Sequence, residues 1–122
     1  MSPRENLSLF LVEDEALIAM DLEALVEDLG HEVFGFAASV EQATELLANL
    51  ETKPDAAIVD ANLGGTSARS IVDQLKAAGI PTIIASGYEP EELQRKGLSG
   101  ILVRKPYHPT AIADALDKVL GH

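Results

Sequence analysis

The sequence predicts an α/β domain in which a parallel sheet carries helices on both faces, and two observations support this. Five short apolar runs alternate with five segments whose apolar residues recur at helical spacing. The apolar runs are nearly continuous, which is typical of strands buried on both faces of a parallel sheet. Strict alternation of strand and helix is characteristic of α/β folds, in which the crossovers are right-handed.

The five predicted strands are short, and two of them end in acidic residues. They cover residues 7–12, 32–37, 56–60, 81–85 and 101–103. The first strand, LSLFLV, runs into Glu13, Asp14 and Glu15, and the third, AAIVD, ends in Asp60. Both strands therefore bring carboxylates to the end of the sheet.

The five predicted helices have recognisable start or stop signals. They cover residues 16–29, 39–50, 67–78, 89–96 and 109–120. Gly30 and Gly79 follow the first and third helices, as C-terminal capping glycines do. Ser39 with Gln42 three residues later forms a capping box for the second helix, and Pro109 suits the first turn of the last.

The length of 122 residues fits one domain, and we expect residues 1–122 to form it alone. For this size and alternation, the flavodoxin-like strand order 2-1-3-4-5 is the leading doubly wound topology. The segment 62–66, which includes Gly64 and Gly65, is predicted to be a mobile loop because glycine imposes little conformational restriction.

The composition excludes several classes of function. The 20 acidic residues outnumber the 9 basic ones and give a formal net charge of -11, so nucleic acid and anionic membrane surfaces would repel this domain. The chain has no cysteine, so thiolate chemistry is excluded. It shows neither a signal peptide nor an apolar run of the ~20 residues that span a membrane. We expect a cytoplasmic location.

Polar residues that follow four of the strands are expected to converge. In open α/β sheets, ligands bind beyond the carboxyl ends of the strands, at the point where the strand order reverses. Glu13, Asp14 and Asp60 would meet there, and such a cluster favours a hard cation such as Mg²⁺. Ser86 and Lys105 follow strands four and five and could bind phosphoryl oxygens. Together they suit phosphoryl transfer to a carboxylate.

With these residues in place, the sequence resembles the receiver domains of two-component response regulators over essentially its whole length. The resemblance rests on four segments in the same order along the chain. They are Leu11-Val12-Glu13-Asp14-Glu15, Ile58-Val59-Asp60, Ala85-Ser86-Gly87 and Lys105-Pro106. Four ordered matches are far more specific than any single one.

The resemblance implies a role for each site residue. Asp60 would accept a phosphoryl group from a histidine kinase or a phosphotransfer protein, and Ser86 and Lys105 would contact that group. The Mg²⁺ ligands would be Glu13, Asp14, Asp60 and the backbone carbonyl of Asn62. The domain would then act as a switch that changes the binding of a downstream protein, and not as an enzyme on other substrates.

A subfamily is also suggested, and the sequence departs from the family pattern at Leu102, Gly64 and Ala68. Residues 81–88, PTIIASGY, partly match the PFxFATGY motif of certain stand-alone receivers, whose partners include kinases of the HWE type. The switch aromatic of the family is Leu102 here, so Tyr88 is a candidate replacement. The Lys105-Pro106 bond is expected to be cis, as in the family.

Two other functions compete with this interpretation. One is a flavodoxin-like nucleotide-binding enzyme or a phosphatase, but no lysine follows the glycine-rich segment 64–67 as a P-loop requires. The other is a degenerate receiver that only mediates contacts, which the complete set of acids, hydroxyl and lysine argues against. The sequence favours neither a monomer nor a dimer.

Overall fold

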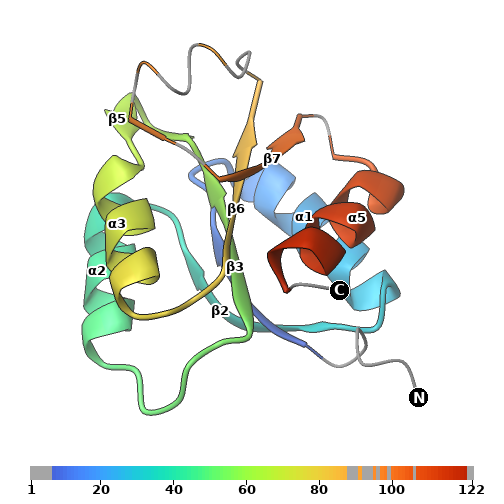
Figure 1. The fold of residues 1–122 in the computed structure, drawn as a ribbon, viewed down its shortest axis with the longest axis horizontal. Coiled ribbons are helices and arrows are strands. Elements are labelled where there is room, and N and C mark those ends of the chain that lie inside the picture. Colours follow the sequence, from blue (N-terminus) through green and yellow to red (C-terminus); the bar gives the residue numbers. More distant parts are fainter. Residues whose placement is uncertain are drawn as a thin grey trace.

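A three-layer α/β fold is seen in the computed structural model, which describes residues 7–87, 91, 95, 97–98, 100–105 and 107–120. The elements run β1 (Ser8–Val12), α1 (Ala16–Asp28), β2 (Glu32–Ala37), α2 (Val40–Ala48), β3 (Ala56–Asp60), β4 (Asn62–Leu63), β5 (Thr66–Ser67), α3 (Arg69–Ala77), β6 (Thr82–Ser86), β7 (Ile101–Arg104) and α5 (Pro109–Val119). Figure 1 shows α2 and α3 on one side of the sheet and α1 and α5 on the other.

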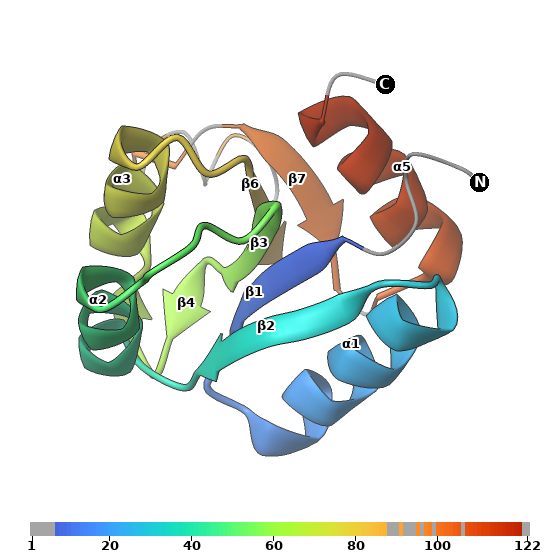
Figure 2. The ribbon, with the colours of Figure 1, turned by 90° about the horizontal axis from the view of Figure 1, so that it is seen from below.

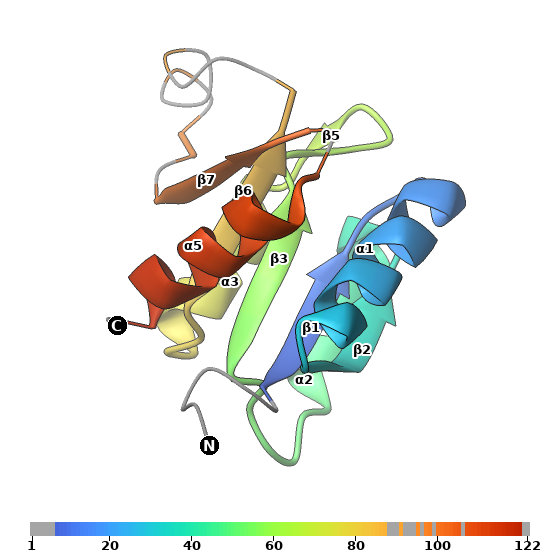
Figure 3. The same ribbon diagram turned by 90° about the vertical axis from the view of Figure 1, so that its right-hand side faces the viewer.

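The main sheet is parallel and has the strand order β2-β1-β3-β6-β7. This is the predicted order 2-1-3-4-5, so the flavodoxin-like prediction is confirmed. Strand β3 is central and buried along its whole length. Figure 3 shows α1 and α5 side by side over one face of the sheet. Because every strand is parallel, their carboxyl ends lie along one edge, where the predicted site is expected.

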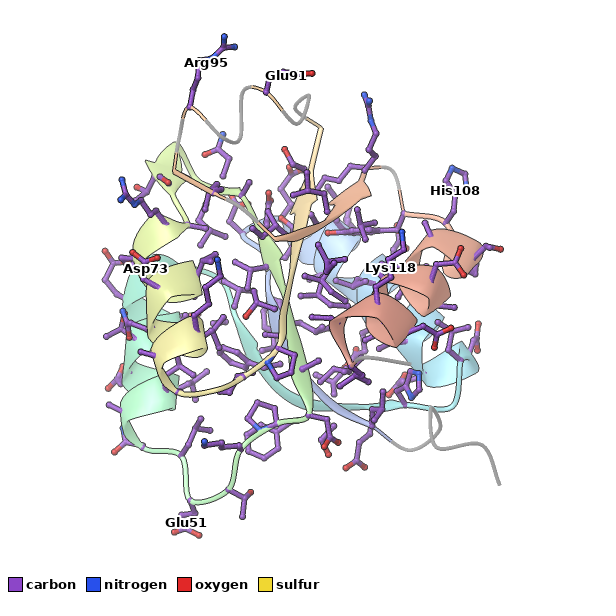
Figure 4. All side chains as sticks on the ribbon, in the orientation of Figure 1. Glu51, Asp73, Glu91, Arg95, His108 and Lys118 are labelled. Atoms are coloured by element: carbon purple, nitrogen blue, oxygen red, sulfur yellow. The ribbon has the colours of Figure 1, made fainter. Side chains whose placement is uncertain are left out.

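The core has two halves because neighbouring residues of a strand point to opposite faces. On β1, Phe10 and Val12 pack toward α2 and α3, whereas Leu9 and Leu11 pack toward α1 and α5. Figure 4 shows the labelled Asp73 on α3, at the outer side of the molecule away from the sheet. No helix within the described ranges is both long enough and apolar enough to cross a membrane.

Helix starts follow the predicted signals. The Ser39 hydroxyl accepts a hydrogen bond from the Gln42 backbone N–H at 3.1 Å, while Gln42 Oε1 accepts from the Ala38 N–H at 2.8 Å. The Gln42 amide of the first turn and the Ala38 amide just before the cap are satisfied in this way. Pro109 lies in the first turn of α5, where its missing N–H costs no hydrogen bond.

The segment predicted to be a loop is instead a short antiparallel hairpin. Asn62 pairs with Ser67, and Leu63 pairs with Thr66. The two-residue turn is formed by Gly64 and Gly65, whose φ angles are 62° and 87°. A type I′ hairpin turn needs positive φ at both central residues, so two glycines are what it requires.

The hairpin also moves the start of the next helix, because the paired residues 66–67 cannot belong to it. Helix α3 starts at Arg69 rather than at Ser67. The strand predicted over 81–85 is found one residue later, at Thr82–Ser86, and Ser86 lies at its end. Three predictions fall wholly or largely outside the described residues. They are the helix over 89–96, the role of Tyr88 and the cis form of the Lys105-Pro106 bond.

Candidate functional site

The sheet order brings Asp60, Glu13 and Lys105 together at the carboxyl ends of β3, β1 and β7. Lys105 Nζ lies 2.8 Å from Asp60 Oδ2 and 2.9 Å from Glu13 Oε1. Glu13 is fully buried, Asp60 is 6% exposed, and the Lys105 side chain is 20% exposed. One ammonium therefore lies between two buried carboxylates. Charges that leave water need pairing of this kind.

The Glu13 carboxylate is held by three groups. Oε1 accepts hydrogen bonds from Lys105 Nζ and, at 3.4 Å, from the Tyr107 hydroxyl. Oε2 accepts from the Glu15 backbone N–H at 3.3 Å. Burial and the neighbouring Asp60 carboxyl raise the pKa of Glu13 to about 7, although Lys105 acts in the opposite direction. The position of Glu13 is thus fixed by its neighbours.

The pKa values of Lys105 and Tyr107 agree with this arrangement. Burial lowers the pKa of Lys105, but the hydrogen bonds to Asp60 and Glu13 together with their negative charges outweigh that effect, and the net shift is upward. Burial, followed by the charges of Glu13 and Asp60, raises the pKa of the Tyr107 hydroxyl. Lys105 therefore stays a cation and Tyr107 stays a hydrogen-bond donor at neutral pH.

Asp60 is held by backbone as well as by Lys105. Its Oδ1 accepts from the Asn62 N–H at 3.1 Å. The side-chain oxygen of Asn62 accepts from the Gly65 N–H at 2.8 Å, within the β4–β5 hairpin. Because the same residue contacts the Asp60 carboxylate and closes the hairpin turn, the hairpin fixes the geometry immediately after the acidic strand end.

Ser86 lies at the carboxyl end of the neighbouring strand. Asp60 pairs with Ala85 in the ladder between β3 and β6, so Ser86 is one residue further along. It is 4% exposed, and its carbonyl accepts a hydrogen bond from the Lys105 N–H at 3.0 Å. This bond joins the two strand ends that carry the hydroxyl and the ammonium.

The acidic residues after β1 form a group that could hold a cation. Carboxylate oxygens of Glu13, Asp14 and Glu15 lie within 4.8 Å of one another, with Glu13 buried and the other two exposed. A Cβ placed on Gly64 would lie 3.7 Å from Asp14 Oδ2, so the hairpin turn borders this group. Hard oxygen donors of this type suit Mg²⁺, which binds one or two carboxylates and keeps several waters.

The predicted site residues can now be compared with their positions. Glu13, Asp60 and Lys105 are in direct contact, Asn62 contacts Asp60, and Ser86 is on the adjoining strand end. The contact that the sequence analysis missed is Tyr107. Its position two residues after the lysine was the only available signal, because a hydrogen bond between residues 94 positions apart leaves no local pattern.

The fold is a doubly wound α/β domain with acidic residues at the carboxyl ends of two neighbouring strands, and comparison with known proteins identifies its family. No protein-family model matches the chain. The phyllosphere-induced regulator PhyR of Methylorubrum extorquens is 33% identical over 115 residues, which is 92% of this chain and 43% of that protein. The transcriptional regulatory protein PdtaR of Mycobacterium tuberculosis is 29% identical over 112 residues, 89% of this chain and 53% of that protein.

Solved structures agree with these relatives. The REC domain of the PhyR response regulator from Erythrobacter litoralis superposes with a TM-score of 0.82 at 32% identity, covering 98% of this chain and 94% of that one. A response regulator receiver protein from Sinorhizobium medicae has a TM-score of 0.80 at 21% identity, which supports the fold alone. The chain belongs to the receiver domain family of response regulators.

Membership in this family assigns the chain to two-component signalling. It is a signalling protein rather than a classical enzyme, so the nucleotide-binding or phosphatase alternative is not supported. The chain spans about half the length of the curated relatives that it matches.

Proposed function

We propose that the chain accepts a phosphoryl group on Asp60 from a phosphohistidine of a histidine kinase or phosphotransfer protein. The observation that carries the proposal is the contact of 2.8 Å between Lys105 Nζ and Asp60 Oδ2 at the end of the central strand. A carboxylate that is nearly buried and paired with one cation is a nucleophile held in a fixed position. The ion pair of Lys105 with Asp60 also argues against a degenerate receiver, which would not need both residues.

The transfer forms one bond and breaks another. An Asp60 carboxylate oxygen attacks the phosphorus atom, the P–N bond of the phosphohistidine breaks, and the imidazole keeps the electron pair. The product is an acyl phosphate on Asp60. The Lys105 ammonium, released from the carboxylate charge, is positioned to pair with a phosphoryl oxygen, and Ser86 offers a hydroxyl donor beside it.

A divalent cation is expected to take part. Glu13, Asp14, Asp60 and the backbone carbonyl of Asn62 would hold Mg²⁺, and their donor atoms are the hard oxygens that this ion prefers. When bound, Mg²⁺ would offset the negative charge that the phosphoryl group adds beside these carboxylates.

We also propose where the domain acts and which proteins it meets. Residues 1–122 would act as a single receiver unit in the cytoplasm, with a kinase of the HWE type as donor and a downstream protein as target. The partial motif over 81–88 supports the choice of kinase.

Intact mass measurement tests the acceptor directly. The protein is incubated with Mg²⁺ and acetyl phosphate, and we expect the mass of one phosphoryl group to be added. Asp60→Asn should abolish the adduct, whereas Asp114→Asn, at an exposed position of α5, should leave it unchanged. Undiminished labelling of Asp60→Asn would refute the assignment.

A further inference from the structure

We propose that the open edge formed by α1, β2 and α2 is a docking surface for a basic amphipathic helix of a partner protein. The large apolar side chains left exposed in the described part of the chain all belong to these three elements. They are Leu17 and Met20 on α1, Phe34 and Phe36 on β2, and Leu46 on α2. Apolar side chains gathered on one face and bordered by charged residues mark interaction sites more often than scattered ones do.

Exposure is greatest on α1, where Leu17 is 78% and Met20 is 63% exposed. Strand β2 forms the edge of the main sheet, and Figure 2 shows it between α1 and α2. Phe36 pairs with Leu11 of β1, which packs on the α1 side of the sheet. Each of the three elements therefore offers exposed apolar side chains at this edge of the molecule.

Grooves lie on both sides of Phe36. The first has a volume of about 220 Å³, and its walls include Phe36 and Val33 of β2 together with Met20 and Glu23 of α1. The second is lined by Phe36 and by residues of α2 that include Leu46. Side chains projecting from one face of a helix fit paired grooves of this kind, because anchors at i and i+3 or i+4 point the same way.

The charge of this region defines the partner. Residues 7–52 contain 11 of the chain's 20 acidic residues and neither Lys nor Arg. Glu23 borders the first groove and Glu45 borders the second. A segment with Lys or Arg beside its apolar anchors would complement these carboxylates, whereas a second copy of this chain or an anionic lipid surface would be repelled.

A helix fits this edge better than an added strand does. The pairing of β2 with β1 is irregular, with a register shift between Leu9 and Phe10. A bulge of this kind disturbs the flat edge that strand addition needs. Each of the two grooves lies between β2 and a neighbouring helix, so the side chains of a docked helix could enter them.

The docking surface is separate from the Asp60 site. The other side of α1 carries Ile18 and Asp21, which line a different groove together with Lys105 and Tyr107. Neither groove of the docking surface is lined by Asp60 or Lys105, so the proposal does not depend on phosphorylation.

Synthetic peptides test the surface. The probe is a helical peptide with Leu along one face and Lys at its flanks, and the comparison peptide has the same composition in scrambled order. We expect the probe to shift backbone amide NMR signals in α1, β2 and α2. Met20→Lys and Glu23→Lys should each weaken binding at least about fivefold, the loss typical of an interface anchor.

Two variants act as controls. Asp114→Lys makes the same charge change as Glu23→Lys but on α5, and it should leave the affinity within about twofold, as expected for a charge remote from the interface. Asp60→Asn should bind the probe as the unaltered protein does. Both groove variants replace exposed side chains, and circular dichroism checks that they fold.

Several results would overturn the proposal. Equal affinity for the scrambled peptide would mean that net charge alone drives binding, and signal shifts centred on α5 or on the Asp60 cleft would place the contact elsewhere. Self-association of the free protein in sedimentation, abolished by Met20→Lys, would show that a second copy covers the surface instead.

Discussion

The Tyr107 hydroxyl donates a hydrogen bond of 3.4 Å to Glu13 Oε1, the same oxygen that accepts from Lys105. A residue in the connection between β7 and α5 is thereby joined to the acidic end of β1. Since Glu13 is fully buried, the energy of its carboxylate depends on these donors rather than on water. A change in the charge of Glu13 should therefore alter the environment of Tyr107, and the reverse should also hold.

Tyr107→Phe removes this hydroxyl and little else. We expect the free energy of unfolding to fall by about 1 kcal/mol, less than is usual for a hydrogen bond to a charged group, because the bond is long. Urea denaturation measures the change. The control is a double-mutant cycle with Glu13→Gln, in which the two changes should be non-additive. Additive losses would mean that Tyr107 contributes by packing alone.

Lys105→Met tests the ammonium between the two carboxylates. Loss of one partner from a buried charge pair costs about 3–5 kcal/mol. Because the Lys105 side chain is 20% exposed, we expect the free energy of unfolding to fall by less, about 1–3 kcal/mol at pH 7 in protein without divalent cation. Lys118→Met on α5, where the lysine is exposed, should cost less than about 0.5 kcal/mol. Equal effects of the two changes would contradict the central role of Lys105.

Asp14→Ala and Glu15→Ala distinguish two candidate cation sites. The resemblance to receivers implies Asp14 as a ligand and not Glu15, although the carboxylates of both lie close to that of Glu13. We expect Asp14→Ala to weaken Mg²⁺ binding at least about tenfold and Glu15→Ala to change it little, since losing a carboxylate ligand costs more than losing a nearby charge. Isothermal titration of Mg²⁺ alone measures this. A larger effect of Glu15→Ala would favour the alternative set.

Most of the fold could be predicted because its signals are local. The apolar runs that became β1 and β3 are buried on both faces, and Ser39 with Gln42 marks the start of α2 by a contact between near neighbours. The convergence of Glu13 and Asp60 followed from the strand order, since parallel strands share their carboxyl edge.

Two features escaped prediction for physical reasons. The β4–β5 hairpin is two residues long on each side, too short for strand periodicity to be seen, so its glycines suggested a mobile loop. The contact of Tyr107 with Glu13 joins residues 94 positions apart, and no local pattern encodes such a contact. The glycine pair carried the hairpin signal, because adjacent glycines between short strands favour a type I′ turn.

Gly65→Ala tests whether that turn requires glycine. Gly65 has a φ of 87°, and a Cβ there would meet no atom within 4 Å, so any cost comes from the backbone alone. An alanine is strained at positive φ, and we expect the free energy of unfolding to fall by about 1 kcal/mol. Gly65→Asn should recover part of this loss, because asparagine tolerates the left-handed region.

Gly87→Ala is the matched control for that substitution. A Cβ at Gly87 also meets no atom within 4 Å, but its φ lies outside the left-handed range. Alanine there reduces the freedom of the unfolded chain without strain in the folded one, so stability should stay level or rise by up to about 1 kcal/mol. Urea denaturation of the three variants compares them directly. If Gly65→Ala proved as stable as Gly87→Ala, the left-handed turn would not limit this segment, and the hairpin would owe its form to the pairing of Leu63 with Thr66 instead.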